Sequence, residues 1–147
     1  MDLLGRKIIQ LQGVGMRQFL GLIQRFCTEN MTNADMIEFV LPLAEVTKQW
    51  GELTMTLAKK SAENADEVGA AATDYLFYSG YAVLAYWWAK SVAVAEGSAH
   101  DSDFRRKKRE TARFYFARIL PRINAHAAAM KSGAANLLAL PDSAFGR

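Results

Sequence analysis

Three glutamates recur at intervals of seven residues in the first half of the chain: Glu38, Glu45 and Glu52. If this segment is helical, the interval places all of them on one face, because about 3.6 residues make one turn. Carboxylates grouped in this way can transfer protons or hold two metal ions. A di-iron bundle also requires Glu-x-x-His pairs, and no glutamate stands three residues before His100 or His126. We therefore interpret the glutamates as a solvated stripe beside an apolar seam, and we expect no metal site.

His126 and Cys27 are the other residues that could act as a base or a nucleophile. No serine or cysteine is spaced to pair with His126, so we interpret it as a hydrogen-bonded packing or interface histidine. Cys27 is the only cysteine, which excludes an intramolecular disulfide and fits a reducing cytoplasm. The sequence also lacks a glycine-rich phosphate loop, a GxSxG elbow and an HExxH motif. We therefore predict no catalytic residue in this chain.

Five consecutive cations form the strongest local charge feature: Arg105, Arg106, Lys107, Lys108 and Arg109. Such a run can hold a phosphate, an anionic partner or another subunit, but it can equally be a solvated helix face. Asp101 and Asp103 precede it and should offset the unfavourable interaction of cations with the start of a helix. The net charge of +3 is too mild to suggest nucleic-acid binding. We favour the solvated face, with anion or partner contact as the alternative.

These residues must be positioned by helices, because the composition favours helix throughout. Hydrophobic residues make up 51% of the chain, and only 3 residues are proline. Apolar residues recur at steps of three and four in three long segments, and one further long segment is apolar on all sides. We expect an all-α single domain over residues 1–147, a four-helix up-and-down bundle with long helices in which the third is the most buried. The expected helices are Leu3–Cys27, a second from near Leu41, Asp66–Glu96 and Asp103–Leu140.

Two prolines lie inside these apolar patterns. Pro42 cannot donate a hydrogen bond to the preceding turn, so the second helix should either kink there or begin near Leu41. We favour a start near Leu41, after a separate turn or short helix over residues 34–41. Pro121 is expected to kink the fourth helix or to free the carbonyl of Ala117. Residues 141–147 are expected to form a frayed end.

The third predicted helix contains no charged residue from Tyr75 to Ala89. These 15 residues would span about 22 Å, which is less than the roughly 30 Å of a bilayer core. We therefore expect a central bundle helix and no membrane span. The N-terminus shows no secretory signal, so a cytoplasmic location is expected. The expected core or interface positions are four aromatic residues and the histidine on the apolar face of the fourth expected helix: Trp50, Tyr86, Trp87, Phe116 and His126.

The residues Thr111–Phe116, Arg118 and Leu120–Arg122 form a pattern that resembles the C-terminal helical domain of bacterial acyl-CoA dehydrogenases. The resemblance is most specific from Thr111 to Arg122, which is similar to the last helix of the larger members of that family. It extends to an Ala-rich stretch after that segment, to two stretches of the preceding helix and to the N-terminus. The residues that carry it outside residues 111–122 are Asp2–Lys7, Ala71, Ala72, Asp74–Leu76, Gly80, Trp87–Ala89, Asp103, Phe104, Lys108, Ala127–Ala129, Gly133 and Leu137.

The resemblance implies that the chain is a C-terminal piece of a larger flavoenzyme of fatty acid metabolism. Enzymes of this family carry out α,β-dehydrogenation of an acyl-CoA thioester, in which a glutamate removes the α-proton and FAD accepts the hydride. Both the glutamate and the flavin site would precede residue 1, and residues 1–28 would end the preceding helical domain. The chain would supply packing and a homo-oligomer interface next to the remainder of the dehydrogenase. We expect the isolated chain to be helical and self-associating, and to bind no FAD.

Two other readings of the sequence remain open. One is a free-standing helical interaction or regulatory bundle that docks an anionic partner through Arg105–Arg109. The other is a membrane-associated protein that uses the uncharged segment from Tyr75 to Ala89.

Overall fold

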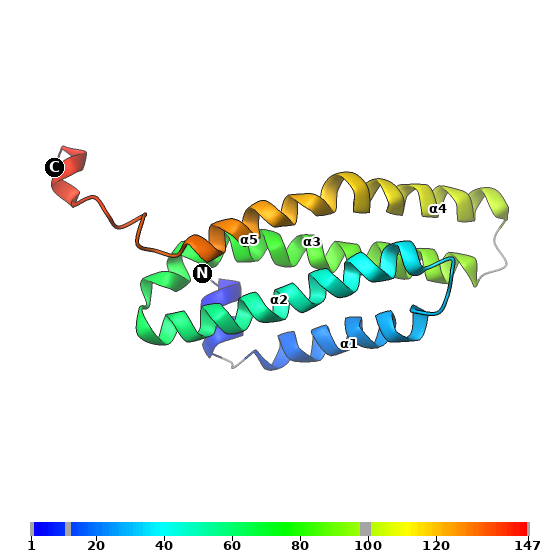
Figure 1. The fold of residues 1–147 in the computed structure, drawn as a ribbon, viewed down its shortest axis with the longest axis horizontal. Helices are drawn as coiled ribbons and strands as arrows, with labels where there is room; N and C mark the ends of the chain where they lie inside the picture. The colour runs from blue at the N-terminus through cyan, green and yellow to red at the C-terminus, as the bar shows by residue number, and fades with distance from the viewer. Residues whose placement is uncertain (1, 11–12, 98–100, 147) are drawn as a thin grey trace.

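The protein is all-helical in the computed structural model, which describes residues 2–10, 13–97 and 101–146 and contains no strand within them. The all-α prediction is therefore confirmed. Figure 1 shows the long helices lying side by side and alternating in direction, with α4 and α5 following one another along α3. The α-helices are α1 (Val14–Asn30), α2 (Ile37–Glu63), α3 (Asp66–Glu96), α4 (Ser102–Phe114) and α5 (Ile123–Ser132).

The N-terminal segment is two helices and not the single predicted one. A π-helix, η1 (Asp2–Gln10), packs against α3, and α1 begins only at Val14. Gly13 separates them with a φ of 62°, a left-handed conformation that residues with a Cβ rarely adopt, and its N–H donates to the carbonyl of Ile8 at 2.6 Å. The prediction of one helix over Leu3–Cys27 was wrong because the sequence pattern did not distinguish this glycine from one inside a helix.

The second helix passes through Pro42 without a break. It begins at Ile37, so the predicted separate segment over residues 34–41 and the start near Leu41 were wrong. Pro42 lies in the second turn, where it leaves only the carbonyl of Glu38 without its usual i+4 donor. The predicted apolar seam does face the core, and its buried members are Phe39, Leu43, Trp50, Leu53 and Leu57.

The third helix has the predicted bounds, Asp66 to Glu96. Just before this helix, the Asn64 Oδ1 accepts a hydrogen bond from the Asp66 N–H at 3.0 Å. Small side chains let neighbouring helices approach closely: Ala82, Ala85 and Ala89 are all fully buried. The helix contacts α2, α4, α5 and η1. None of the described helices is both long and apolar enough to cross a bilayer.

The fourth segment begins as predicted and changes helix type midway. Asp101 caps α4 by accepting the Phe104 N–H at 2.7 Å. A π-helical turn, η2 (Tyr115–Ile119), and a 3-10 turn, η3 (Leu120–Arg122), then link α4 to α5. The Leu120 N–H reaches back to the Tyr115 carbonyl, five residues earlier. The irregularity expected at Pro121 is thus a wider π-helical turn before the proline and a tighter 3-10 turn that contains it.

The long helix ends earlier than predicted. The expected helix to Leu140 was wrong, because α5 stops at Ser132 and Gly133 follows with a φ of 75°. Beyond it the chain leaves the bundle as an arm that ends in a short 3-10 turn, η4 (Asp142–Phe145), as Figure 1 shows. Leucines along this arm are exposed, including Leu137 and Leu140.

Candidate functional site

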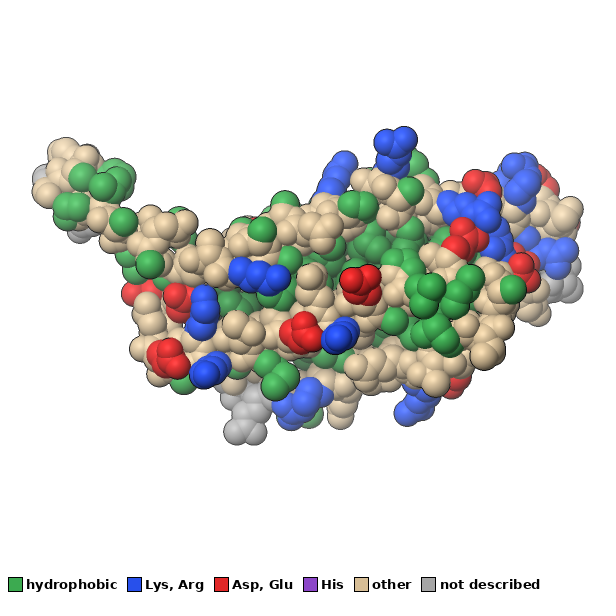
Figure 2. Space-filling model, in the orientation of Figure 1, with side chains coloured by type: hydrophobic (Ala, Val, Ile, Leu, Met, Phe, Trp, Pro, Cys, Tyr) green, Lys and Arg blue, Asp and Glu red, His purple; other side chains and the backbone are tan. Residues whose placement is uncertain are grey.

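The basic run lies at the start of α4 and is partly neutralised by the acidic residue in front of it. The Asp103 carboxylate forms ion pairs with Arg106 Nη2, at 2.6 Å, and with Lys107 Nζ, at 2.5 Å. Hydrogen bonds from Lys107 and then Arg106 hold the pKa of the Asp103 carboxyl below its usual range. Figure 2 shows blue and red side chains interleaved at the end of the molecule where α4 lies. The predicted offset of the run by a preceding aspartate is therefore present.

Arg109 belongs to an ion-pair network between helices. Its Nη1 lies 3.0 Å from Oε1 of Glu38, and its Nη2 lies 2.8 Å from Oε1 of Glu96. Nη1 also donates to the Asp35 carbonyl at 2.7 Å. Arg113, one turn later, places its Nε 2.8 Å from Oε2 of Glu38, and hydrogen bonds from Arg113 and then Arg109 lower the pKa of that carboxyl. The network ties α4 to the start of α2 and the end of α3.

The run therefore does not present five equivalent cations to one partner. The Arg109 side chain is only 16% exposed, whereas those of Arg106 and Lys107 are 66% and 69% exposed. The Lys108 amine lies 5.5 Å from the centre of the Phe104 ring. Contact of this run with an anion stays a prediction, and Arg109 is the residue for which the structure supplies another role.

The three glutamates of the predicted stripe are all exposed, and they do not act together. Glu38 enters the arginine network, and Glu52 lies 4.0 Å from Lys48, whereas Glu45 stands at the rim of a shallow hollow beside α5. Among the described residues, no group of three or more His, Cys, Asp or Glu side chains is placed to hold a metal ion.

His126 joins α5 to α3. Its Nδ1 lies 2.8 Å from Oδ1 of Asp74. Its ring stacks on Phe77, with 5.2 Å between centroids, and on Tyr81, with 5.7 Å. A hydrogen-bonded, stacked and partly buried imidazole of this kind fixes two helices relative to each other.

Three of the predicted core or interface aromatics lie inside the bundle. Trp50 and Tyr86 are 5% and 2% exposed. Phe19 packs edge-on against both, with centroid separations of 6.3 Å and 5.8 Å. Phe116 is partly buried and packs against Phe39 at 5.3 Å. These contacts join α1, α2, α3 and η2 into one core.

Trp87 differs from the other aromatics because half of its surface is exposed. It lies on the outer face of α3, with the Lys90 amine 5.5 Å from its ring. Other large apolar side chains are exposed on this helix at helical spacing, and we call this set the α3 stripe: Leu76, Leu84, Trp87 and Val94. Stripes of this kind mark surfaces that are covered by another protein or by another part of the same protein.

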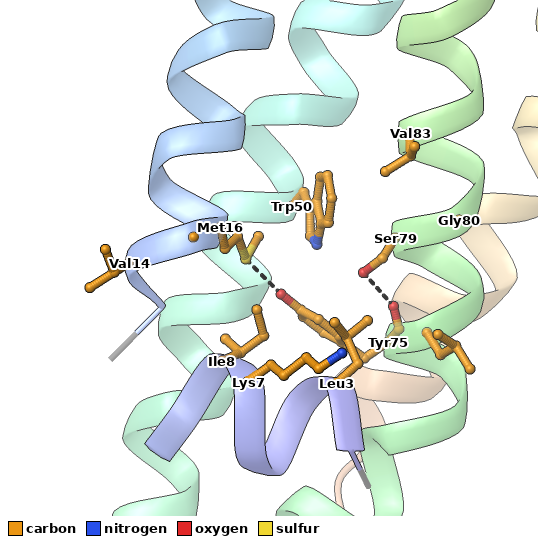
Figure 3. Close-up of a pocket in the computed structure, with 12 residues that line it drawn as sticks. Leu3, Lys7, Ile8, Val14, Met16, Trp50, Tyr75, Ser79, Gly80 and Val83 are labelled. Carbon is orange, nitrogen blue, oxygen red and sulfur yellow. Dashed lines mark hydrogen bonds between the residues drawn. The ribbon is translucent and has the colours of Figure 1, made fainter. Parts of the chain in front are cut away.

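A cavity of about 850 Å³ opens between η1, α1 and α3, with one residue of α2 in its wall (Figure 3). Most of its lining is apolar, including Leu3, Ile8 and Val83. Lys7 contributes an amine, and three neutral polar residues from α2 and α3 complete the lining: Trp50, Tyr75 and Ser79. The volume lies within the range of about 300–1,000 Å³ that is usual for small-molecule sites.

The polar groups of this cavity differ in how well they are satisfied. The Tyr75 hydroxyl lies 2.8 Å from both Met16 Sδ and Thr54 Oγ1, and Ser79 Oγ donates to the Tyr75 carbonyl at 2.7 Å. Burial raises the pKa of Tyr75 to about 12, although its contacts with Thr54 and Trp50 act in the opposite direction. The buried Trp50 N–H does not reach hydrogen-bond geometry and has no partner among the described residues.

Sequence reasoning did not find the cavity or the arginine network. Trp50 was expected as a core or interface residue, and nothing in its spacing predicted that η1 would leave space beside it. The network joins Glu38 to Arg109, which are 71 residues apart in the chain. The network could have been predicted from one signal. Glu38 stands at the start of the second helix and the basic run at the start of the fourth, and alternating helix directions place these two starts at the same end of a bundle.

The cavity lining does not fit a flavin dinucleotide. A diphosphate needs cations or clustered backbone N–H groups. Lys7 is the cation of this lining, and its amine also lies 3.5 Å from Asp2. We therefore do not place a flavin diphosphate in this cavity.

Comparison with known protein families gives one finding. The sequence model of a family described as acetyl-CoA dehydrogenase C-terminal like matches residues 19–141. No curated protein matches the chain. The matched range covers α2 to α5 with most of α1, and it includes the α3 stripe.

Proposed function

Because the matched range covers most of its length, this chain belongs to the acetyl-CoA dehydrogenase C-terminal-like family, and we propose that it serves as the C-terminal helical part of an FAD-dependent acyl-CoA dehydrogenase. In the proposed enzyme, an acyl-CoA thioester is dehydrogenated between its α and β carbons. The catalytic base and the flavin site belong to another part of that enzyme. The proposed location of the enzyme is the cytoplasm. The family match over residues 19–141 is the observation that carries this proposal.

The contribution of this chain would be packing against the remainder of the dehydrogenase and a homo-oligomer interface. The α3 stripe supports this role, because its four side chains are each at least half exposed and the segment from Tyr75 to Ala89 carries no charge. Full burial of an apolar side chain of this size gains about 1.5–3 kcal/mol, so a side chain that is already half buried gains about half of that when another surface covers it. A covered stripe is thus a reasonable source of assembly energy.

We further propose that the helices form a four-helix up-and-down bundle with α3 as its most buried member. In this description α4, η2, η3 and α5 together act as the fourth helix. The contacts of α3 with α2, α4 and α5, and its fully buried alanines, support this arrangement.

The proposal is tested on the protein that the native cell makes. An antibody raised against this chain should capture a polypeptide much longer than 147 residues that carries flavin absorbance and reduces an artificial electron acceptor when acyl-CoA is added. The isolated chain should show a helical circular dichroism spectrum and should not retain FAD. Capture of a polypeptide of only 147 residues that carries no flavin would contradict the proposal. A yellow, flavin-loaded preparation of the isolated chain would also contradict it.

A further inference from the structure

The cavity beside Trp50 has a buried donor aimed into it. Only 5% of the Trp50 surface is exposed. Figure 3 shows its indole nitrogen directed toward the space bounded by Ser79 and Tyr75. A buried N–H without an acceptor costs about 1–3 kcal/mol, so such groups are found almost always with a partner. An oxygen atom inside the cavity would remove this cost.

The wall around that donor favours an uncharged oxygen. Ser79 and Tyr75 are neutral and buried. The Ser79 hydroxyl already donates its hydrogen bond to the Tyr75 carbonyl, so it retains only acceptor capacity. Burial opposes ionisation of the Tyr75 hydroxyl in the same wall, and it would oppose an anion there for the same reason. A hydroxyl group could accept from Trp50 and still donate, whereas a carboxylate could not.

The rest of the cavity favours an apolar body. Leu3, Ile8 and Val83 line it, together with the open side of Gly80, where an added Cβ would meet no atom within 4 Å. Lys7 lies at the edge of this lining, where it is more than half exposed, and its charge is offset by Asp2, whose carboxylate lies 3.5 Å from its amine.

We propose that this cavity binds an uncharged amphiphile. This is an apolar molecule with one hydroxyl or carbonyl oxygen that accepts a hydrogen bond from Trp50 Nε1. Octanol is a suitable probe because it has one such oxygen and an unbranched apolar chain. Octanoate is its matched anion, with the same chain length. The proposal concerns the isolated chain and stands whether or not the chain is part of a dehydrogenase.

The test follows the three tryptophan indole N–H signals in a nitrogen-proton correlation spectrum during titration with octanol. The Trp50 signal is identified by its loss in Trp50→Phe, which keeps an aromatic ring of similar shape. Octanol should move this signal downfield and saturably, and Trp50→Phe should weaken binding about fivefold, the effect of one hydrogen bond. Trp87→Phe is the matched control and should bind octanol as the original chain does, because Trp87 lies outside the cavity lining.

A second variant tests the cavity without changing the donor. Gly80→Leu fills open space and improves helix propensity, so it should preserve the fold and weaken octanol binding by about tenfold or more. The proposal is overturned if octanol leaves the Trp50 signal in place, if Trp50→Phe binds octanol with unchanged affinity, or if octanoate binds as tightly as octanol. It is equally overturned if Gly80→Leu is folded and keeps full affinity.

Discussion

Glu38 is the residue that connects the two arginines of α4 to α2, and its charge should matter to stability. The Glu38→Gln substitution keeps the shape of the side chain but removes the ion pairs with Arg109 and Arg113. Because all three groups are at least partly exposed, we expect a loss of only about 0.5–1 kcal/mol in the free energy of unfolding at pH 7. Glu45→Gln, on the same stripe and outside the network, is the matched control. Urea denaturation of the three proteins measures the difference.

The same residue predicts a dependence on pH. The pKa of Glu38 is lower in the folded chain than its ordinary value of about 4.3, so the carboxylate contributes its stability above that value. The contribution should be lost as the pH falls from there through the lower pKa of the folded state. The stability difference between the original chain and Glu38→Gln should therefore disappear in acid. A difference that persists unchanged at the lowest pH at which the chain stays folded would contradict this account.

Cys27 should be chemically silent while the chain is folded. It is 3% exposed, and burial raises the pKa of its thiol to about 11, compared with about 8.5 for an exposed cysteine. At pH 8 the reactive thiolate is thus both rare and shielded. We expect negligible labelling by a thiol reagent in the native chain and complete labelling in denaturant. Rapid stoichiometric labelling of the folded chain would show that α1 opens or that Cys27 is not buried.

At the scale of the helices, Gly133 is the residue that stops α5. Its φ of 75° and ψ of −174° form a conformation almost restricted to glycine, and an added Cβ would lie 3.1 Å from the Glu67 carboxylate, which also accepts the Ala134 N–H. Gly133→Ala should therefore lower the free energy of unfolding by about 1–3 kcal/mol. Thermal unfolding followed by circular dichroism measures this loss.

The matched control for this substitution is Gly21→Ala. Gly21 lies within α1 in an ordinary helical conformation, and an added Cβ there meets no atom within 4 Å. Alanine should be neutral or stabilising at this position by up to about 1 kcal/mol. Equal destabilisation by both substitutions would mean that the special backbone at Gly133 is not what ends the helix.

The helices themselves could be predicted better than their ends. Steps of three and four placed the seam of α2 correctly, because the burial of a face sets that period. Gly13 and Gly133 were missed because their positive φ values arise from the turns they form, and the same residue type occurs inside α1 at Gly21. Pro42 was overinterpreted, since a proline in the second turn of a helix loses a single hydrogen bond.

At the scale of the whole molecule, the site features depend on contacts between distant segments. Trp50 stands on the predicted seam and is buried, but its unpartnered N–H depends on where η1 packs. Arg109 looked like one of five similar cations, and only the return of α4 alongside α2 gives it Glu38 as a partner. Trp87 illustrates the opposite case, because its spacing was compatible with core or interface and its exposure leaves the interface as its remaining predicted role.

The α3 stripe makes the proposed self-association testable. The double substitution Leu84→Glu with Trp87→Glu places two charges on side chains that are each 50% exposed, so the fold should tolerate them. If a second copy covers the stripe, the buried charges and lost apolar contacts should raise the dissociation constant about hundredfold or more. Light scattering coupled to gel filtration should then report a monomer with unchanged helical content.

Leu41→Glu with Met55→Glu is the matched control for the stripe variant. These residues are 55% and 76% exposed on α2 and lie away from the stripe, so the control carries the same added charge. It should assemble as the original chain does, because only the location of the charge differs. If the stripe variant and the control dissociate equally, added negative charge alone explains the effect. If the original chain is monomeric, the proposed self-association through the α3 stripe is wrong.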